Sequence, residues 1–256
     1  MVIAPLVLLG VAALLLCMPA PRLVISEETT RITAPLTADG YIDFFKALEL
    51  KTYPPELATD DNGFRVFVRA FGNVGEATTL SDPEFYRLQK YEKLSLDPDT
   101  PPTYTLPLAP HVVIKNFYEA KEEKVPDKVD ALWQNPWTLE QLPMFEDWIN
   151  ECDVPLDAIA EMIRQPIFMP PLLHHPAYAE TGRYGSLFSL LLPDVQTFRE
   201  IARMFQARAM YRIAQGNIDG AIDDKLTIHR LGRLKTTRCL PIGLTNVMFR
   251  WMRLPK

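Results

Sequence analysis

Histidine and carboxylate side chains are the residues of this sequence that could perform acid–base or metal chemistry. His174 and His175 are adjacent, and His229 follows Asp219 along the chain. Adjacent side chains diverge in an extended segment, and no C-x-x-C or H-E-x-x-H motif completes a metal site, so no metal-binding residue is predicted. A hydrolase that combines these histidines with Asp219 or Glu161 is an alternative function that rests on residue type alone.

Motifs for nucleophilic catalysis and cofactor binding are missing from the sequence. It contains no G-x-S-x-G, P-loop or G-x-G-x-x-G pattern, and Ser186 and Ser189 lie in an apolar run without the glycines of a nucleophile elbow. His229 shares a helical register with Ile222 and Leu226, which is typical of a hydrogen-bonded histidine at the edge of a core. We therefore predict no catalytic residue and no cofactor.

The charged residues of the last two predicted helices have structural explanations. Three aspartates, Asp219, Asp223 and Asp224, cluster where a helix should start, and the helix dipole favours carboxylates there. Four arginines flank an apolar stripe on the preceding helix: Arg199 and Arg203 on one side, Arg208 and Arg212 on the other. An anion-binding groove is the alternative, but we expect their long stems to cover the edges of a packed face.

Composition excludes several classes of protein. The 256 residues are 48% hydrophobic, which is enough for a proper core. The 27 basic and 32 acidic side chains give a net charge of −5, without the clustered basic excess that nucleic-acid binding needs. The three cysteines, Cys17, Cys152 and Cys239, lie too far apart for a disulfide framework.

Residues 1–21 are predicted to be a membrane anchor. No charged side chain occurs from Val2 to Pro21, a run that matches the about 20 apolar residues of a transmembrane helix. The small residue Ala20 is followed by Pro21, which makes a poor cleavage site, and the leucines before Cys17 do not fit a lipobox. We expect a single retained span with the bulk of the protein outside the cytoplasm, or a secreted protein if the segment is cleaved.

Helical spacing dominates the rest of the chain. Residues 22–36 are predicted to be a stalk, followed by an N-terminal helical region at 37–96. Its helices should start near Thr37–Asp39, at Asp61 or Asn62, and at Asp82, with stops before Tyr53, at Phe71 and at Lys93. Five prolines between positions 97 and 110 predict an extended connection at 97–112, which is a candidate boundary between domains or layers.

The C-terminal region, 113–256, is predicted to be helical as well. Thr138 to Gln141 form a capping-box pattern, and a further helix should start at Asp153 and end at Pro166. The clearest periodicity predicts a helix from about 193 to 215, the first half of a helical hairpin at 193–237.

Residues 207–222 resemble the interior of a tetratricopeptide repeat. In such repeats a glycine closes the first helix and a small alanine lets the second helix pack closely, and Gly216 and Ala221 stand at these positions. No second copy of the pattern is visible, and stacked repeats are normally needed for a solenoid.

A wider resemblance covers nearly the whole chain. It includes the apolar leader, Ala34-Pro35-Leu36, residues 39–43, Trp148, Leu156-Asp157 and the hairpin that ends in His229-Arg230. The chain is similar in these features to a large family of uncharacterised membrane-anchored or exported planctomycete bacterial proteins. The resemblance implies a helical extracytoplasmic protein and supplies no catalytic residue. Because such proteins usually continue with further helices, a truncated chain without activity of its own is a third alternative, with apolar residues near Leu244 to Phe249 left uncovered.

These observations together predict an all-α protein, with helical hairpins in a tetratricopeptide-like or irregular bundle after the N-terminal membrane segment. The predicted function is a protein- or peptide-interaction module. Its expected partners are the membrane, through residues 1–21, and a protein or peptide; nucleic acid is not expected.

Overall fold

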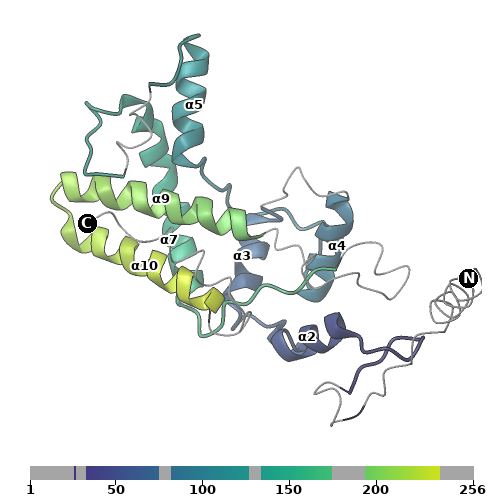
Figure 1. Cartoon of the computed structure of the whole chain (residues 1–256). Coiled ribbons are helices and arrows are strands. Elements are labelled where there is room, and N and C mark those ends of the chain that lie inside the picture. The colour runs from purple at the N-terminus through teal and green to yellow at the C-terminus, as the bar shows by residue number, and fades with distance from the viewer. Residues whose placement is uncertain (1–25, 27–32, 75–81, 127–133, 175–193, 237–256) are drawn as a thin grey trace, which may run out of the picture.

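The computed structural model shows an all-α protein and describes residues 26, 33–74, 82–126, 134–174 and 194–236 (Figure 1). The α-helices are α2 (Phe44–Thr52), α3 (Gly63–Phe71), α4 (Pro83–Lys93), α5 (Pro110–Ala120), α7 (Glu146–Arg164), α9 (Asp194–Ala214) and α10 (Ile218–Thr236), with short 3₁₀ turns η1 (Pro55–Leu57) and η2 (Pro143–Phe145). Within these ranges the only β-type pairings are isolated bridges, Leu36 with Ile42 and Asn62 with Ile167.

The predicted membrane segment, 1–21, lies outside the described residues. Among the helices that the structure does describe, none combines the length and the apolar character needed to cross a membrane.

Side-chain caps set the starts of the N-terminal helices. The carboxylate of Asp82 accepts a hydrogen bond from the backbone N–H of Phe85 at 3.0 Å, and the Asn62 side chain accepts one from Phe64 at 3.1 Å. Gly72 ends α3 with a φ of 75°, a left-handed conformation that favours glycine. The predicted starts at Asn62 and Asp82 and the stop at Phe71 are confirmed.

The predicted helix start at Thr37–Asp39 is wrong. Thr37 to Gly40 form a turn instead, in which the Gly40 N–H donates to the Thr37 carbonyl at 2.9 Å. The helix begins only at Phe44, because the side chain of Asp43 accepts a hydrogen bond from the Lys46 N–H at 2.8 Å and acts as the cap.

Two prolines behave differently from the sequence-based expectation. Pro110 opens α5, where its missing N–H costs nothing, so the proline-rich connection predicted at 97–112 ends at Ala109. Pro155 lies inside α7, and the helix predicted to start at Asp153 is the second half of this longer helix. Buried side chains recur on both sides of Pro155, so packing keeps the helix continuous despite one lost backbone hydrogen bond. The predicted stop before Pro166 is confirmed by the end of α7 at Arg164.

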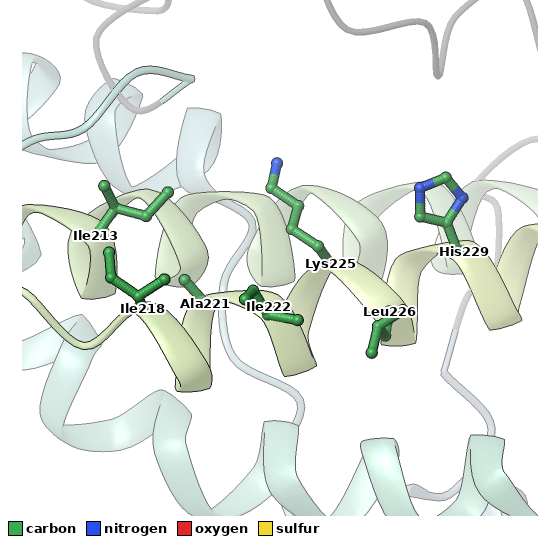
Figure 2. A pocket seen from close by; sticks show the side chains of 7 residues that line it. All are labelled: Ile213, Ile218, Ala221, Ile222, Lys225, Leu226 and His229. Atoms are coloured by element: carbon green, nitrogen blue, oxygen red, sulfur yellow. The ribbon is translucent and has the colours of Figure 1, made fainter.

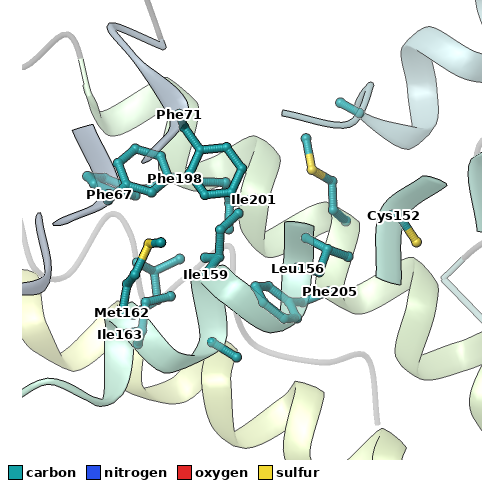
Figure 3. Close-up of a cluster of buried hydrophobic side chains, with 14 of the residues drawn as sticks. Phe67, Phe71, Cys152, Leu156, Ile159, Met162, Ile163, Phe198, Ile201 and Phe205 are labelled. Atoms are coloured by element: carbon teal, nitrogen blue, oxygen red, sulfur yellow. The ribbon is translucent and has the colours of Figure 1, made fainter. Parts of the chain in front are cut away.

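The core forms where α3, α7 and α9 meet (Figure 3). Phe67 of α3 lies 6.1 Å from Phe198 of α9 between ring centroids, and Phe64 lies 6.0 Å from the same ring. Ile159 of α7 and Ile201 of α9 are buried beside them. Buried residues of the N-terminal and C-terminal helical regions therefore belong to one hydrophobic cluster.

The start of α3 is pressed against the end of α7. A Cβ atom on Gly63 would lie 1.9 Å from the backbone oxygen of Met162, so no other residue fits there without separating the two helices. The Gly63 N–H donates to the Ile167 carbonyl at 2.8 Å, which fixes the segment that follows α7 along the start of α3.

The predicted hairpin at 193–237 is present as α9 and α10, which run side by side in Figure 1. Gly216 turns the chain between them with a φ of 77°, and the side chain of Asn217 accepts a hydrogen bond from the Gly220 N–H at 3.0 Å. Ala221 is buried against α9, as its small size allows.

Candidate interaction surface on helix α10

An apolar stripe on α10 is exposed rather than buried. Ile218 and Ile222 are each 51% exposed, and Leu226 is 45% exposed. They are spaced four residues apart, so they share one face of the helix. With Ile213 of α9 and the flanking Ala221, Lys225 and His229, they line a shallow hollow of about 260 Å³ (Figure 2).

This stripe corrects the sequence-based view of the same residues. Ile222, Leu226 and His229 do share a register, but that face points outward instead of lying at a core edge. The opposite side of α10 is the buried one and carries Asp224 and Leu231. An apolar stripe that the described helices leave exposed is typical of an interaction site.

Charged residues border the exposed stripe. Asp219 and Asp223 are exposed along the first half of α10, and Arg230 and Arg233 are exposed along the second half. The stripe therefore has an acidic border at the start of α10 and a basic border towards its end.

Among the described residues, the histidines proposed for the hydrolase, His174 and His229, are not brought together with Asp219 or Glu161. His174 lies against the rings of Phe45 and Phe85, at centroid distances of 5.7 and 5.6 Å. The side chain of Gln89 binds its ring at 3.0 Å and also accepts a hydrogen bond from its backbone N–H at 2.7 Å. His174 thus links the segment after α7 to α2 and α4, which is a structural role.

The other members of that hypothetical site are dispersed. Glu161 forms an ion pair with Arg164 of the same helix, and Asp219 is exposed near the start of α10. His229 lines the hollow on α10, and His175 lies outside the described residues. In the part of the chain that the structure describes, no group of three or more His, Cys, Asp or Glu side chains could hold a metal ion.

A buried ion network joins α7, α9 and α10, and it was not predicted from the sequence. Arg208 of α9 is 1% exposed and donates to both carboxylate oxygens of Asp224, at 2.6 and 3.2 Å. Asp224 is 2% exposed and also accepts a hydrogen bond from Arg212 at 3.1 Å. On α7, Asp157 and Asp153 approach Arg208 at 2.9 and 3.2 Å.

The expectation that all four arginines of α9 cover the edges of a packed face is therefore wrong for Arg208. The expectation that Asp224 serves only the helix dipole is wrong as well. Both residues face the helix interface, and their registers with Phe205 and Ala221 place them there. Arg203, by contrast, pairs with Glu200 at 2.8 Å at the surface, as a partly exposed arginine should.

The electrostatics of this network indicate a structural role rather than catalysis. Burial raises the pKa of the Asp224 carboxyl, although Arg208 and Arg212 act in the opposite direction. Burial lowers the pKa of Arg208, but the hydrogen bonds that it donates to Asp224 and the negative charge of that carboxylate outweigh this effect and raise the pKa overall. Burial also raises the pKa of the neighbouring Cys152 thiol to about 12, which makes it inert as a nucleophile at neutral pH.

A second charged group links α2 and α4. Glu49 is paired with Lys46 at 2.6 Å and with Lys93 of α4. Burial, with a contribution from the charge of Lys46, lowers the pKa of Lys93 from 10.5 to about 8. The folded protein therefore loses the proton of Lys93 at a lower pH than the unfolded chain does.

The stability of the protein is expected to depend on Lys93 between pH 8 and 10.5. A lowered amine pKa means that the unfolded chain binds more protons in this range, so the Lys93 contribution to the free energy of unfolding rises with pH. The variant Lys93→Met should lack this contribution. The difference in the free energy of unfolding between the wild type and the variant should therefore change by about 1 to 2 kcal/mol from pH 7.5 to pH 10.5, after allowance for partial solvent screening. Urea unfolding of both proteins at pH 7.5, 9 and 10.5 measures it. Burial raises the pKa of the Tyr53 hydroxyl to about 12, as it does that of the Cys152 thiol, but both groups are present in both proteins and their contributions cancel. A constant difference in the free energy of unfolding across the three pH values would contradict the prediction.

Comparisons of the chain with protein-family models, with curated proteins and with solved structures give no match.

Proposed function

We propose that this protein is an interaction module that binds an amphipathic helix of a partner protein or peptide on the exposed face of α10. The observation that carries the proposal is the stripe of Ile218, Ile222 and Leu226, which remains exposed on a helix whose other side is already packed. In the same proposal, residues 1–21 anchor the module to the membrane with its helices outside the cytoplasm.

The shape of the stripe favours a helical partner. Its apolar residues recur at helical spacing, so the hollow runs along α10, with Ile213 of α9 at the end near Ile218 (Figure 2). An amphipathic helix lays its apolar face into such a groove through residues spaced three and four apart. The acidic border formed by Asp219 and Asp223 favours a partner with basic residues beside its apolar stripe.

The proposal is tested by affinity capture in detergent from the native membrane, with quantitative mass spectrometry of the bound proteins. Leu226→Asp places a charge in the stripe and is expected to reduce capture of the partner at least tenfold. Leu88→Asp is the matched control, because Leu88 is also a helical leucine with 45% exposure, on α4. Circular dichroism checks that both variants keep the helix content of the wild type. Identical sets of bound proteins for the wild type and Leu226→Asp would contradict the proposal.

A further inference from the structure

The exposed face of α10 has a candidate occupant in the same chain. We infer that residues 244–254 fold back onto this face as a helix antiparallel to α10, and that a partner has to displace them. The displacement step rests on the proposed function, whereas the docking of the segment does not.

The sequence of this segment fits the face in pattern and length. Apolar residues recur at helical spacing: Leu244, Val247, Met248, Trp251, Met252 and Leu254. This spacing predicts one apolar stripe, with Phe249, Arg250 and Arg253 outside it. A helix of this extent is about 16 Å long, which equals the rise of about 16 Å between Ile218 and His229 on α10.

The residues between α10 and the segment allow the chain to reverse. Pro241 cannot continue a helix and disfavours helical backbone at Leu240, and Gly243 tolerates turn conformations. Fully extended, residues 237–243 reach about 23 Å. Packed helices lie about 8 to 10 Å apart, so this reach is sufficient for an antiparallel return along α10.

The distribution of charged residues also favours an antiparallel return of the segment along α10. Residues 237–256 contain Arg238, Arg250, Arg253 and Lys256 and no acidic residue. An antiparallel return carries the last three of these basic residues towards the first half of α10. Asp219 and Asp223 border the apolar stripe there, so opposite charges meet. A parallel arrangement would bring the basic residues to Arg230 and Arg233 instead.

Occupation of the stripe by residues 244–254 would make partner binding conditional. The segment and a partner helix need the same apolar side chains, Ile222 and Leu226 in particular, so only one of them binds at a time. The apparent affinity for the partner is reduced by the fraction of molecules in which the segment is docked.

Disulfide trapping in the full-length protein tests the docking. In a Cys17→Ser, Cys239→Ser background, the pairs Leu226→Cys with Met248→Cys and Ile222→Cys with Met252→Cys are oxidised under mild conditions at low protein concentration. Arg203→Cys with Met248→Cys is the control, because Arg203 is exposed on α9 away from the hollow. At least one stripe pair is expected to form an intramolecular bond ten or more times faster than the control. Bonds that form no faster than the control overturn the inference, and bonds found only in dimers show that a second copy of the chain occupies the face.

A second experiment avoids new cysteines and separates this inference from the proposed function. Met248→Asp with Met252→Asp should release the segment, so that a labelled synthetic peptide of residues 237–256 binds to the variant and not to the same variant with Leu226→Asp. Absence of peptide binding to the released variant overturns the docking.

Partner capture by the released variant should rise several-fold over the wild type. If the peptide binds while partner capture is unchanged, the docking stands and the displacement step is wrong; if Leu226→Asp abolishes capture while trapping fails, the proposed function stands and the docking is wrong.

Discussion

Asp224→Ala is expected to lower the free energy of unfolding by about 3 to 5 kcal/mol. The substitution removes the carboxylate that accepts two hydrogen bonds from Arg208, at 2.6 and 3.2 Å. Arg208 is 1% exposed, so its guanidinium would keep its charge at a site with little access to water. The remaining partners, Asp153 and Asp157, have largely exposed side chains and compensate less than a buried carboxylate does.

Asp223→Ala is the control for this prediction, because it removes an exposed aspartate one residue earlier on the same helix. It should change the free energy of unfolding by less than about 0.5 kcal/mol. Urea unfolding followed by circular dichroism measures both variants. The double variant Arg208→Met with Asp224→Leu removes both charges and should recover most of the lost stability, since a buried ion pair adds little net stability over well-packed apolar residues. A loss of under about 1 kcal/mol for Asp224→Ala would show that the network is not a structural centre.

Local signals along the sequence predict most of the helices. Asn62 and Asp82 combine a capping side chain with the apolar spacing that follows, and Gly72 and Gly216 mark stops where a left-handed backbone is needed. These features act over a few residues, so they can be recognised without knowledge of the fold. Pro155 is the exception, because packing on both sides of it outweighs the local preference to break the helix.

The candidate site could be predicted only in part. The sequence gives the register that groups Ile222, Leu226 and His229, but not the direction in which that face points. Whether this face of α10 points outward depends on which side of the helix packs against α7 and α9. The packed side includes the buried pair of Arg208 and Asp224, whose 16-residue separation has no local signature.

Asn62→Ala is expected to lower the free energy of unfolding by about 3 to 4 kcal/mol, because four hydrogen bonds of a fully buried side chain are lost. The amide of Asn62 donates to the carbonyls of Leu57 and Met169 at 3.1 and 3.0 Å. Its oxygen accepts from the N–H groups of Phe64 and Met169 at 3.1 and 2.9 Å. One side chain thus caps α3 and holds the segment after α7, 107 residues away, against it.

Asn150→Ala is the matched control, since Asn150 is exposed on α7, and it should change stability by less than about 0.5 kcal/mol. Asn62→Asp separates the role of the donors from that of the acceptor. It keeps an oxygen for Phe64 and Met169, but the two carbonyls lose their donor and an unpaired charge is buried. We therefore expect Asn62→Asp to be at least as destabilising as Asn62→Ala at pH 7, and less so at pH 4, where protonation of the carboxyl removes the charge and restores one donor. If the aspartate variant were as stable as the wild type at pH 7, the link between α3 and the segment after α7 would depend on the cap alone.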